Sequence, residues 1–322
     1  MLASVGQQAP FDHGRRQLEL LAGLEVTTKA VERTAEAIGE DVAGQQQKQI
    51  RGALQLDLPV VLGDPIPILY IEIDASGVPV VESETEGREG KTEGEPAHTR
   101  DAKLGCVFTQ TSFDDEGRAV RDPDSSSYTA AIETAEEFGK RIYAEASQRG
   151  WSRAKKKVVL GDGAPWIWNI AHQYFPGSIE IVDLYHARER LWELARHLHP
   201  NQQVEQRRWM MIYQHLLEEG KIEELVSGLR AMEPASEEIA QQIRTKAAYF
   251  ETHTERMRYA QFRRQHLFVG SGVIEAGCKT VIGARCKQSG MFWTVRGANA
   301  ILALRCCHVN ARFEDYWEAR RA

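Results

Sequence analysis

Apolar and polar residues alternate along this chain with periods that change from helical to strand-like. The segment 15–42 has apolar residues at a helical period that is interrupted at Gly23–Thr28, which predicts two helices separated by a tight break. A polar, glutamine-rich connection follows at 44–49. The apolar run 68–80, ILYIEIDASGVPV, then predicts a buried strand. The segment 1–14 has no regular apolar period and is expected to be a lead-in segment.

Strand and helix patterns alternate through the next part of the chain. The predicted elements are an exposed charged loop at 82–98, a strand at 103–111, a polar turn-rich segment at 114–124, a helix at 128–149, a strand at 156–160, a helix at 166–175, a strand at 179–182 and a helix from 183 to 198. A strand, helix, strand, helix order is typical of a sheet with parallel neighbours. Such sheets place their chemistry at the carboxyl ends of the strands.

The last third of the chain is predicted to be helical. From Pro200 to about Gln265 the strand signal disappears, so this block is interpreted as an insertion. The segment 268–285 then begins a helix capped by Ser271, and a final helix from 295 to about 321 should close the core. The expected fold class is therefore α/β: a mixed sheet flanked by helices, interrupted by an all-helical insertion and preceded by a small helical region.

Composition and charge narrow the classes of function. The 322 residues are 42% hydrophobic and 27% charged, which is ordinary for a globular protein with a real core. The formal net charge of −6 argues against a uniformly basic nucleic-acid binder, so any DNA contact must come from a local basic surface. The five cysteines include no CxxC pair, and the chain has no signal peptide or membrane-length apolar run. A reduced, cytoplasmic protein is expected.

Three acidic residues stand near the ends of predicted elements. Asp74 is placed at the exit of the first strand, Asp162 directly after the strand at 156–160, and Glu275 in the first turns of a helix. Two Mg²⁺ or Mn²⁺ ions held by a few carboxylates can activate a water or a 3′-hydroxyl in phosphodiester chemistry. The alternative is structural, because both Asp residues open good turns and Glu275 with Lys279 forms an ordinary i,i+4 surface pair.

Basic residues are concentrated in one segment of this acidic chain. The range 244–296 has ten Lys or Arg against three Glu, a balance of +7, which favours polyanion binding. Solvated helix faces are the alternative. The candidates for positions near the site or in contact with DNA are Lys279, Arg285, Lys287, Trp293 and Arg296. Trp293 could stack on an unpaired base or belong to the core.

The hairpin predicted at 15–42 has helix-turn-helix spacing. Thr27 or Thr28 would cap its second helix, whose outer face presents Lys29 and Arg33 to a DNA partner. The mixed charge of that face leaves an ordinary helical hairpin as the alternative.

Five ordered motifs carry a resemblance that covers nearly the whole chain. IEIDASGVPV, VVLGDGAPWIWNIA, IVDLYHARERLWELA, GSGVIEAGCKTVIGARCKQSGMFW and FEDYWEARRA resemble bacterial insertion-sequence transposases of the ISKra group. The resemblance implies a DDE transposase related to the Mutator and hAT types, with a ribonuclease-H-like core. By it, Asp74, Asp162 and Glu275 are the three catalytic, metal-binding acids. Asp183 and His186 match a D-x-x-H element that is expected near the site, contacting DNA or organising the core, or else Asp183 only caps the following helix.

The same resemblance implies a domain order and an activity. The domains are a helix-turn-helix-like DNA-binding region at 1–50, the catalytic core at 60–198 and 266–322, and the insertion at 199–265. The activity would be metal-dependent hydrolysis at transposon ends and strand transfer into target DNA, with two Mg²⁺ or Mn²⁺ ions and a homo-oligomer bound to DNA at the nucleoid. In similar proteins the amino-terminal region extends further, so end recognition by this chain alone is expected to be incomplete. Two alternatives stay open: a catalytically silent DNA-binding remnant or regulator, and a structure-specific nuclease of the same fold.

Overall fold

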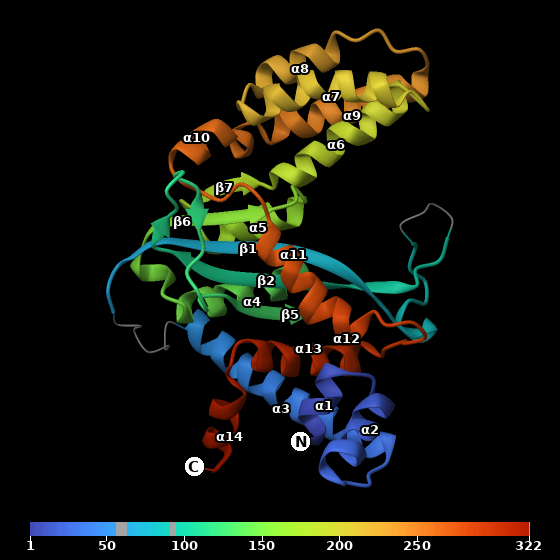
Figure 1. Cartoon of the computed structure of the whole chain (residues 1–322), viewed down its shortest axis with the longest axis vertical. Coiled ribbons are helices and arrows are strands. Elements are labelled where there is room, and N and C mark those ends of the chain that lie inside the picture. Colours follow the sequence, from blue (N-terminus) through green and yellow to red (C-terminus); the bar gives the residue numbers. More distant parts are fainter. Residues whose placement is uncertain (56–62, 91–94, 322) are drawn as a thin grey trace. The chain divides into compact units, whose positions relative to one another are not determined.

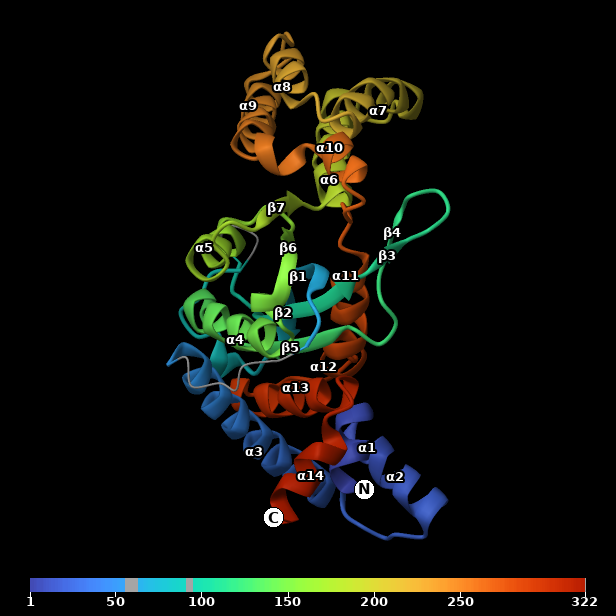
Figure 2. The same cartoon turned by 90° about the vertical axis from the view of Figure 1, so that its left-hand side faces the viewer.

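The computed structural model describes residues 1–55, 63–90 and 95–321 (Figures 1 and 2). The chain forms two compact units. The first unit comprises Met1–Thr109, Pro123–Lys155 and Gly272–Ala322, and the second comprises Gln110–Asp122 and Lys156–Ser271. In the described part of the chain, no helix has both the length and the apolar character needed to cross a membrane.

Five strands form a mixed sheet in the order β5-β2-β1-β6-β7. They are β1 (Ile66–Pro79), β2 (Thr99–Gln110), β5 (Ser127–Ala131), β6 (Ala154–Gly161) and β7 (Ile179–Val182). β2 and β5 pair antiparallel, whereas β6 and β7 pair parallel. The strand β1 is buried on both faces from Ile68 to Ile73, as expected for a strand covered on both sides. The predicted α/β class, the mixed sheet and the parallel neighbours are therefore confirmed.

Helices at both ends of the chain pack together in the first unit. The helices are α1 (Leu2–Gln8), α2 (Phe11–Ala22), α3 (Thr28–Leu54), α4 (Ala135–Gln148), α13 (Val295–Val309) and α14 (Phe313–Arg321). Thr27 caps α3 by accepting a hydrogen bond from the Ala30 amide at 3.1 Å, and Gly23 ends α2 in a left-handed conformation. A Cβ on Gly39 of α3 would lie 2.1 Å from the Ala300 carbonyl oxygen of α13. Glycine at this position therefore permits the close crossing of these two helices.

Several predicted boundaries in the first unit are wrong. The lead-in segment contains α1, which buries Ala3, Gly6 and Gln7. The glutamine-rich connection at 44–49 is part of α3, because glutamine is a good helix former and Ile50 keeps the helix on the core. The helix predicted from 128 begins only at Ala135, after a Thr134 cap. The final helix is two helices, separated where Ala311 has a φ of 56°.

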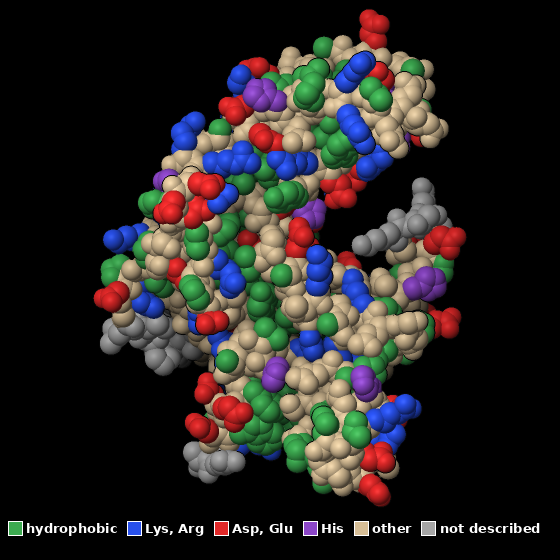
Figure 3. All heavy atoms as spheres, viewed as in Figure 1, with side chains coloured by type: hydrophobic (Ala, Val, Ile, Leu, Met, Phe, Trp, Pro, Cys, Tyr) green, Lys and Arg blue, Asp and Glu red, His purple; other side chains and the backbone are tan. Residues whose placement is uncertain are grey.

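The second unit contains the predicted helical block together with β7 and most of β6. Its helices are α5 (Pro165–Tyr174), α6 (Leu184–Leu198), α7 (Gln203–Glu218), α8 (Ile222–Arg230), α9 (Glu237–Thr252) and α10 (Tyr259–Arg264). A short 3₁₀ turn, Thr254–Met257, precedes α10, and a small hairpin pairs β3 (Ser112–Phe113) with β4 (Ala119–Val120). The strand β4 lies in the segment 114–124, which was predicted only as polar and turn-rich, and β3 directly precedes that segment. On the face drawn in Figure 3, Lys and Arg side chains lie among Asp and Glu side chains over the helices of this unit.

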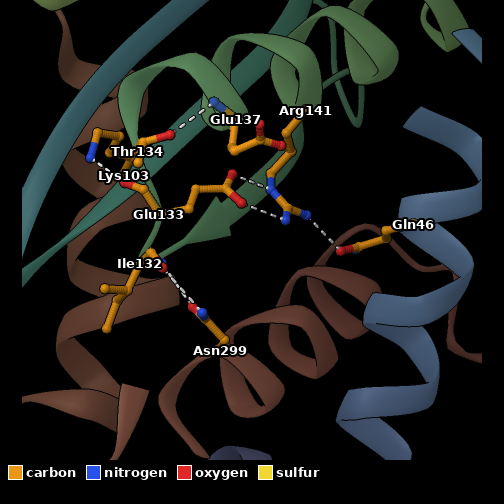
Figure 4. A network of polar contacts seen from close by, with 8 residues as sticks. All are labelled: Gln46, Lys103, Ile132, Glu133, Thr134, Glu137, Arg141 and Asn299. Carbon is orange, nitrogen blue, oxygen red and sulfur yellow. Dashed lines mark hydrogen bonds and ion pairs between the residues drawn. The ribbon is translucent and has the colours of Figure 1, made fainter. Parts of the chain in front are cut away.

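Asn299 of α13 and Asn310, the residue that follows this helix, contact the backbone at the two ends of the edge strand β5 in the first unit. The Asn299 amide accepts from the Ile132 N–H at 2.7 Å and donates to the Ile132 carbonyl at 3.1 Å (Figure 4). Asn310 brackets the backbone of Tyr128 in the same way, at 2.7 and 2.8 Å. Beside them, the Arg141 guanidinium binds both oxygens of Glu133 and reaches Gln46 of α3. The backbone groups of Tyr128 and Ile132 at this strand edge are thus paired within the protein.

Candidate functional site

Asp74 lies within β1, and both of its carboxylate oxygens accept hydrogen bonds. Oδ1 accepts from the Ala75 N–H at 2.7 Å, and Oδ2 accepts from the Cys278 thiol at 3.4 Å. The prediction that Asp74 stands at the exit of the strand, followed by a sharp turn, is wrong, because β1 continues to Pro79. Burial of Val78 and the close approach of Thr99 to Gly77 keep the strand extended past Asp74.

Three residues on one face of β1 each contact the helical segment that carries Glu275. Side chains at 72, 74 and 76 share a face because a strand alternates its side chains. Glu72 accepts from the Ile274 N–H at 2.8 Å, Asp74 contacts Cys278, and Ser76 accepts from the Lys287 ammonium. The segment consists of α11 (Gly272–Gly277), a π-helical turn (Cys278–Gly283), α12 (Ala284–Cys286) and the C-cap residue Lys287. π-Helical turns are often found at functional sites.

Asp74 and Glu275 act on the same sulfur atom. Burial raises the pKa of the Cys278 thiol most, the charge and hydrogen bond of Asp74 raise it further, and the charge of Glu275 adds to them. Lys287 acts in the opposite direction. Glu275 lies in the first turn of α11 as predicted. The first unit therefore brings two of the three predicted acids into electrostatic reach of one group.

Asp162 belongs to the second unit and directly follows β6, as predicted. Its Oδ1 accepts from the Ala164 N–H at 2.8 Å, which organises the entry into α5. Its backbone carbonyl accepts from the Tyr249 hydroxyl at 3.1 Å. The next residue, Gly163, has a φ of 95°, a conformation that favours glycine. Asp162 is thus both a strand-end residue and a turn residue.

Asp183 caps α6 and is fully buried. Its Oδ1 accepts from the His186 N–H at 2.7 Å, and its Oδ2 accepts from the Ser271 N–H. Burial raises the pKa of Asp183, but the hydrogen bonds from His186 and Ser271 outweigh it, so that the pKa lies below its ordinary value. The His186 Nδ1 lies 3.3 Å from the same carboxylate. Asp183 is therefore a helix cap that also connects α6 to Ser271. Because it is buried, its carboxylate is not exposed to solvent.

No protein-family model matches the chain, and no relative is found among curated proteins.

The donor chemistry of the three acids fits a hard divalent cation. Carboxylate oxygens are the ligands that Mg²⁺ and Mn²⁺ prefer, and these ions are commonly held by one or two carboxylates together with water and substrate oxygens. Among the described residues, no three His, Cys, Asp or Glu side chains form a ready-made metal site. The Asp74 contact with Cys278 is a weak thiol bond that a cation could replace.

Most of the basic residues at 244–296 already have partners inside the protein. Five of them form ion pairs: Arg244 with Glu237, Lys246 with Glu193, Arg256 with Glu180, Arg258 with Glu223 and Glu255, and Arg296 with Glu40. Arg285 is fully buried, with its guanidinium over the rings of Phe11 and Trp293 at 4.5 and 4.8 Å. Arg285 and Trp293 are therefore core residues and neither side chain is available to DNA.

The other four basic residues are exposed and make no ion pair in the part of the chain that the structure describes. They are Arg263, Arg264, Lys279 and Lys287. In the amino-terminal hairpin, Lys29 is exposed but paired with Glu32, and Arg33 is exposed on the outer face of α3. The inner face of α3 is buried, including Val31 and Ala35. A basic surface for DNA would therefore involve fewer residues than the sequence count indicates.

Two residues that contact the backbone at or beside a predicted acid were not identified from the sequence. Glu72 is fully buried, and it could have been recognised as an acid inside the apolar run IEID, because a buried carboxylate needs a hydrogen-bond partner. Tyr249 had no such signal, because its contact with Asp162 joins residues 87 positions apart.

Proposed function

We propose that this protein is a DNA transposase of the DDE type with a ribonuclease-H-like core. The mixed sheet supports this proposal, since it combines an antiparallel pair with a parallel pair and is flanked by helices. The order of the acids along the chain, with a helical block between the second and the third, also supports it.

The observation that carries the proposal is the attachment of the Glu275 helix to the strand that bears Asp74. Glu72, Asp74 and Ser76 contact successive points of this helical segment. Through these contacts Asp74 lies beside Cys278, whose thiol also responds to the charge of Glu275. Two partly buried carboxylates from one strand and one helix are the kind of donors that a hard divalent cation takes.

In the proposed reaction, each group has a defined task. Asp74, Asp162 and Glu275 would hold Mg²⁺ or Mn²⁺. When bound, such ions favour the ionised form of a water or 3′-hydroxyl and stabilise the leaving oxygen. Asp183 orients the start of α6, and Lys279 and Lys287 contact DNA phosphates. The products would be a cut transposon end and then an end joined to target DNA.

An assay with labelled duplexes from the ends of the element that encodes the chain, a target plasmid and Mg²⁺ tests the proposal. Cut ends and joined product are expected for the wild type. Asp74→Ala, Asp162→Ala and Glu275→Ala should each lower the rate at least about a hundredfold, as expected when a group that stabilises charge in the transition state is removed. Circular dichroism would confirm that the fold is retained.

The matched control is Asp115→Ala, which removes an exposed acid in the β3–β4 hairpin and should leave the rate unchanged. Cutting without joining would assign the protein as a nuclease, and binding alone would assign a silent DNA-binding protein. Undiminished cutting by the three acid variants would exclude these residues from the reaction.

A further inference from the structure

Helix α9 contacts the turn that carries Asp162, and it does so through Tyr249. The Tyr249 hydroxyl donates to the Asp162 carbonyl at 3.1 Å. The hydroxyl is a donor at neutral pH, because a phenol ionises only at a pH of about 10. One helical turn later, His253 packs edge-on against the Tyr249 ring at 4.9 Å, and it also contacts the Gly163 backbone.

The Tyr249 ring fits closely over the glycine that follows Asp162. A Cβ on Gly163 would lie 2.6 Å from the Tyr249 hydroxyl oxygen and 2.9 Å from a ring carbon. Gly163 also has a φ of 95°, which other residues rarely adopt. The turn at Gly161–Asp162–Gly163 and the tyrosine are therefore matched in shape as well as joined by a hydrogen bond.

The helix that carries Tyr249, and the turn after it, are held by several contacts within the second unit. Lys246 forms an ion pair with Glu193 of α6. Phe250 is fully buried. Just beyond the helix, Arg256 binds Glu180 of β7 at 2.5 Å and lies 4.6 Å over the Trp168 ring of α5. A tyrosine on such a support can hold the backbone of a turn in one conformation.

We propose that Tyr249, supported by His253, is a positioning residue that fixes the Asp162 turn and so sets the direction of the Asp162 carboxylate. The helical block would then contribute to the reaction centre through α9, in addition to any DNA contact of its own. The metal-binding part of this inference rests on the proposed function, whereas the ordering of the turn does not. Without the tyrosine hydroxyl, the Asp162 carbonyl loses a hydrogen bond and the turn gains freedom.

The test compares Tyr249→Phe with the wild type in three measurements on the full chain. Phenylalanine keeps the ring over Gly163 and removes only the hydroxyl. Amide exchange of the peptide covering 161–166 should become about fivefold faster, as expected for the loss of one hydrogen bond. The affinity for Mn²⁺, measured by calorimetry without DNA, should fall by a similar factor. With end DNA, kcat should fall while KM for DNA stays within about twofold.

The control is Tyr213→Phe, which makes the same chemical change on α7, where Tyr213 stacks on Trp209. It should change none of the three measurements. Unchanged exchange at 161–166 in Tyr249→Phe would overturn the inference, as would an equal change in Tyr213→Phe. Faster exchange with unchanged Mn²⁺ affinity in a protein that binds Mn²⁺ would overturn the link between turn and carboxylate. If the wild type neither binds Mn²⁺ nor cuts DNA, the proposed function fails, and the exchange measurement alone decides whether Tyr249 orders the turn.

Discussion

At the residue scale, Glu72 is the buried side chain on which the position of Glu275 depends. Its carboxylate accepts the Ile274 N–H at 2.8 Å, one residue before Glu275. Glu72→Ala removes the acceptor and leaves a buried N–H without this partner, so the free energy of unfolding should fall by about 1 to 3 kcal/mol. Chemical denaturation followed by circular dichroism measures this loss.

The comparison variant for this prediction is Glu72→Gln, which keeps an oxygen acceptor of the same length. It should retain most of the stability that Glu72→Ala loses. Mn²⁺ affinity should also fall more in Glu72→Ala, because α11 would be less firmly held beside Asp74. Equal stability of the wild type and Glu72→Ala would show that the hydrogen bond does not anchor the helix.

His253 gives the second unit a pH dependence that can be measured. Burial and then the charge of Arg256 lower the pKa of His253 to about 4, against the opposing effects of the Gly163 backbone, Asp162 and Glu180. The ordinary value in an unfolded chain is about 6.5. Between these two pH values the unfolded chain binds a proton that the folded chain does not, so stability is lost as the pH falls from about 6.5 to about 4, by up to about 3 kcal/mol.

His253→Phe keeps a ring in the cluster and removes the titration. The difference in unfolding free energy between pH 7 and pH 4.5 should therefore be smaller in His253→Phe than in the wild type. His197→Gln, which changes an exposed histidine on α6, should keep the wild-type difference. An identical pH dependence in all three proteins would contradict the low pKa of His253.

At the element scale, Asn299 of α13 and Asn310 directly after this helix each hold the backbone at one end of the edge strand β5 by two hydrogen bonds. Asn299→Ala removes both hydrogen bonds to Ile132, and the unfolding free energy should fall by about 1 to 3 kcal/mol. Asn299→Asp keeps an acceptor for the Ile132 N–H but loses the donor to its carbonyl, so its loss should be intermediate. Thermal unfolding measures both. Asn169→Ala, at an exposed position on α5, is the control, and an equal loss there would refute the bracket as the cause.

The same strand shows why part of the fold could not be predicted from the sequence. Residues 128–131 continue the helical period of the segment after them, yet they pair with Lys103–Cys106 of β2, and the backbone of Tyr128 is held by Asn310. These partners come from distant parts of the chain and override the local pattern. By contrast, the strand at 179–182 and the helix ending at Leu198 were predicted at their observed boundaries, because Asp183 supplies a local capping signal.

The same distinction applies to the candidate site: features set by neighbouring residues could be predicted, and features set by distant residues could not. Asp162 could be placed after a strand because a short apolar run ends in Gly-Asp-Gly. The position of Asp74 inside β1 and its contact with Cys278 could not be predicted, since both depend on residues far along the chain. The burial of Arg285 could not be predicted either, because no sequence pattern marks an arginine that packs between two aromatic rings.

At the scale of the whole molecule, the charge distribution limits how DNA could be bound. Ion pairs and burial engage most of the basic residues at 244–296, whereas Lys279, Arg263 and Arg264 are exposed and make no ion pair in the described part of the chain. Each phosphate contact releases counterions and contributes about 0.9 to the slope of log affinity against log salt. If the proposed DNA binding uses these residues, removing one should lower the steepness of that slope by about one.

Fluorescence anisotropy of labelled end DNA between 50 and 200 mM salt, a range in which phosphate contacts change affinity strongly, measures the slope for each variant. Lys279→Ala and Arg264→Ala should each weaken binding and flatten the slope. Arg244→Ala removes an exposed arginine that pairs with Glu237, so it should leave the slope unchanged while removing the same formal charge. An equal effect of all three variants would mean that DNA responds to the net charge of the chain. A flatter slope in Lys279→Ala and Arg264→Ala alone would place phosphate contacts at those two side chains, because all three variants remove the same charge and only a local contact would make their slopes differ.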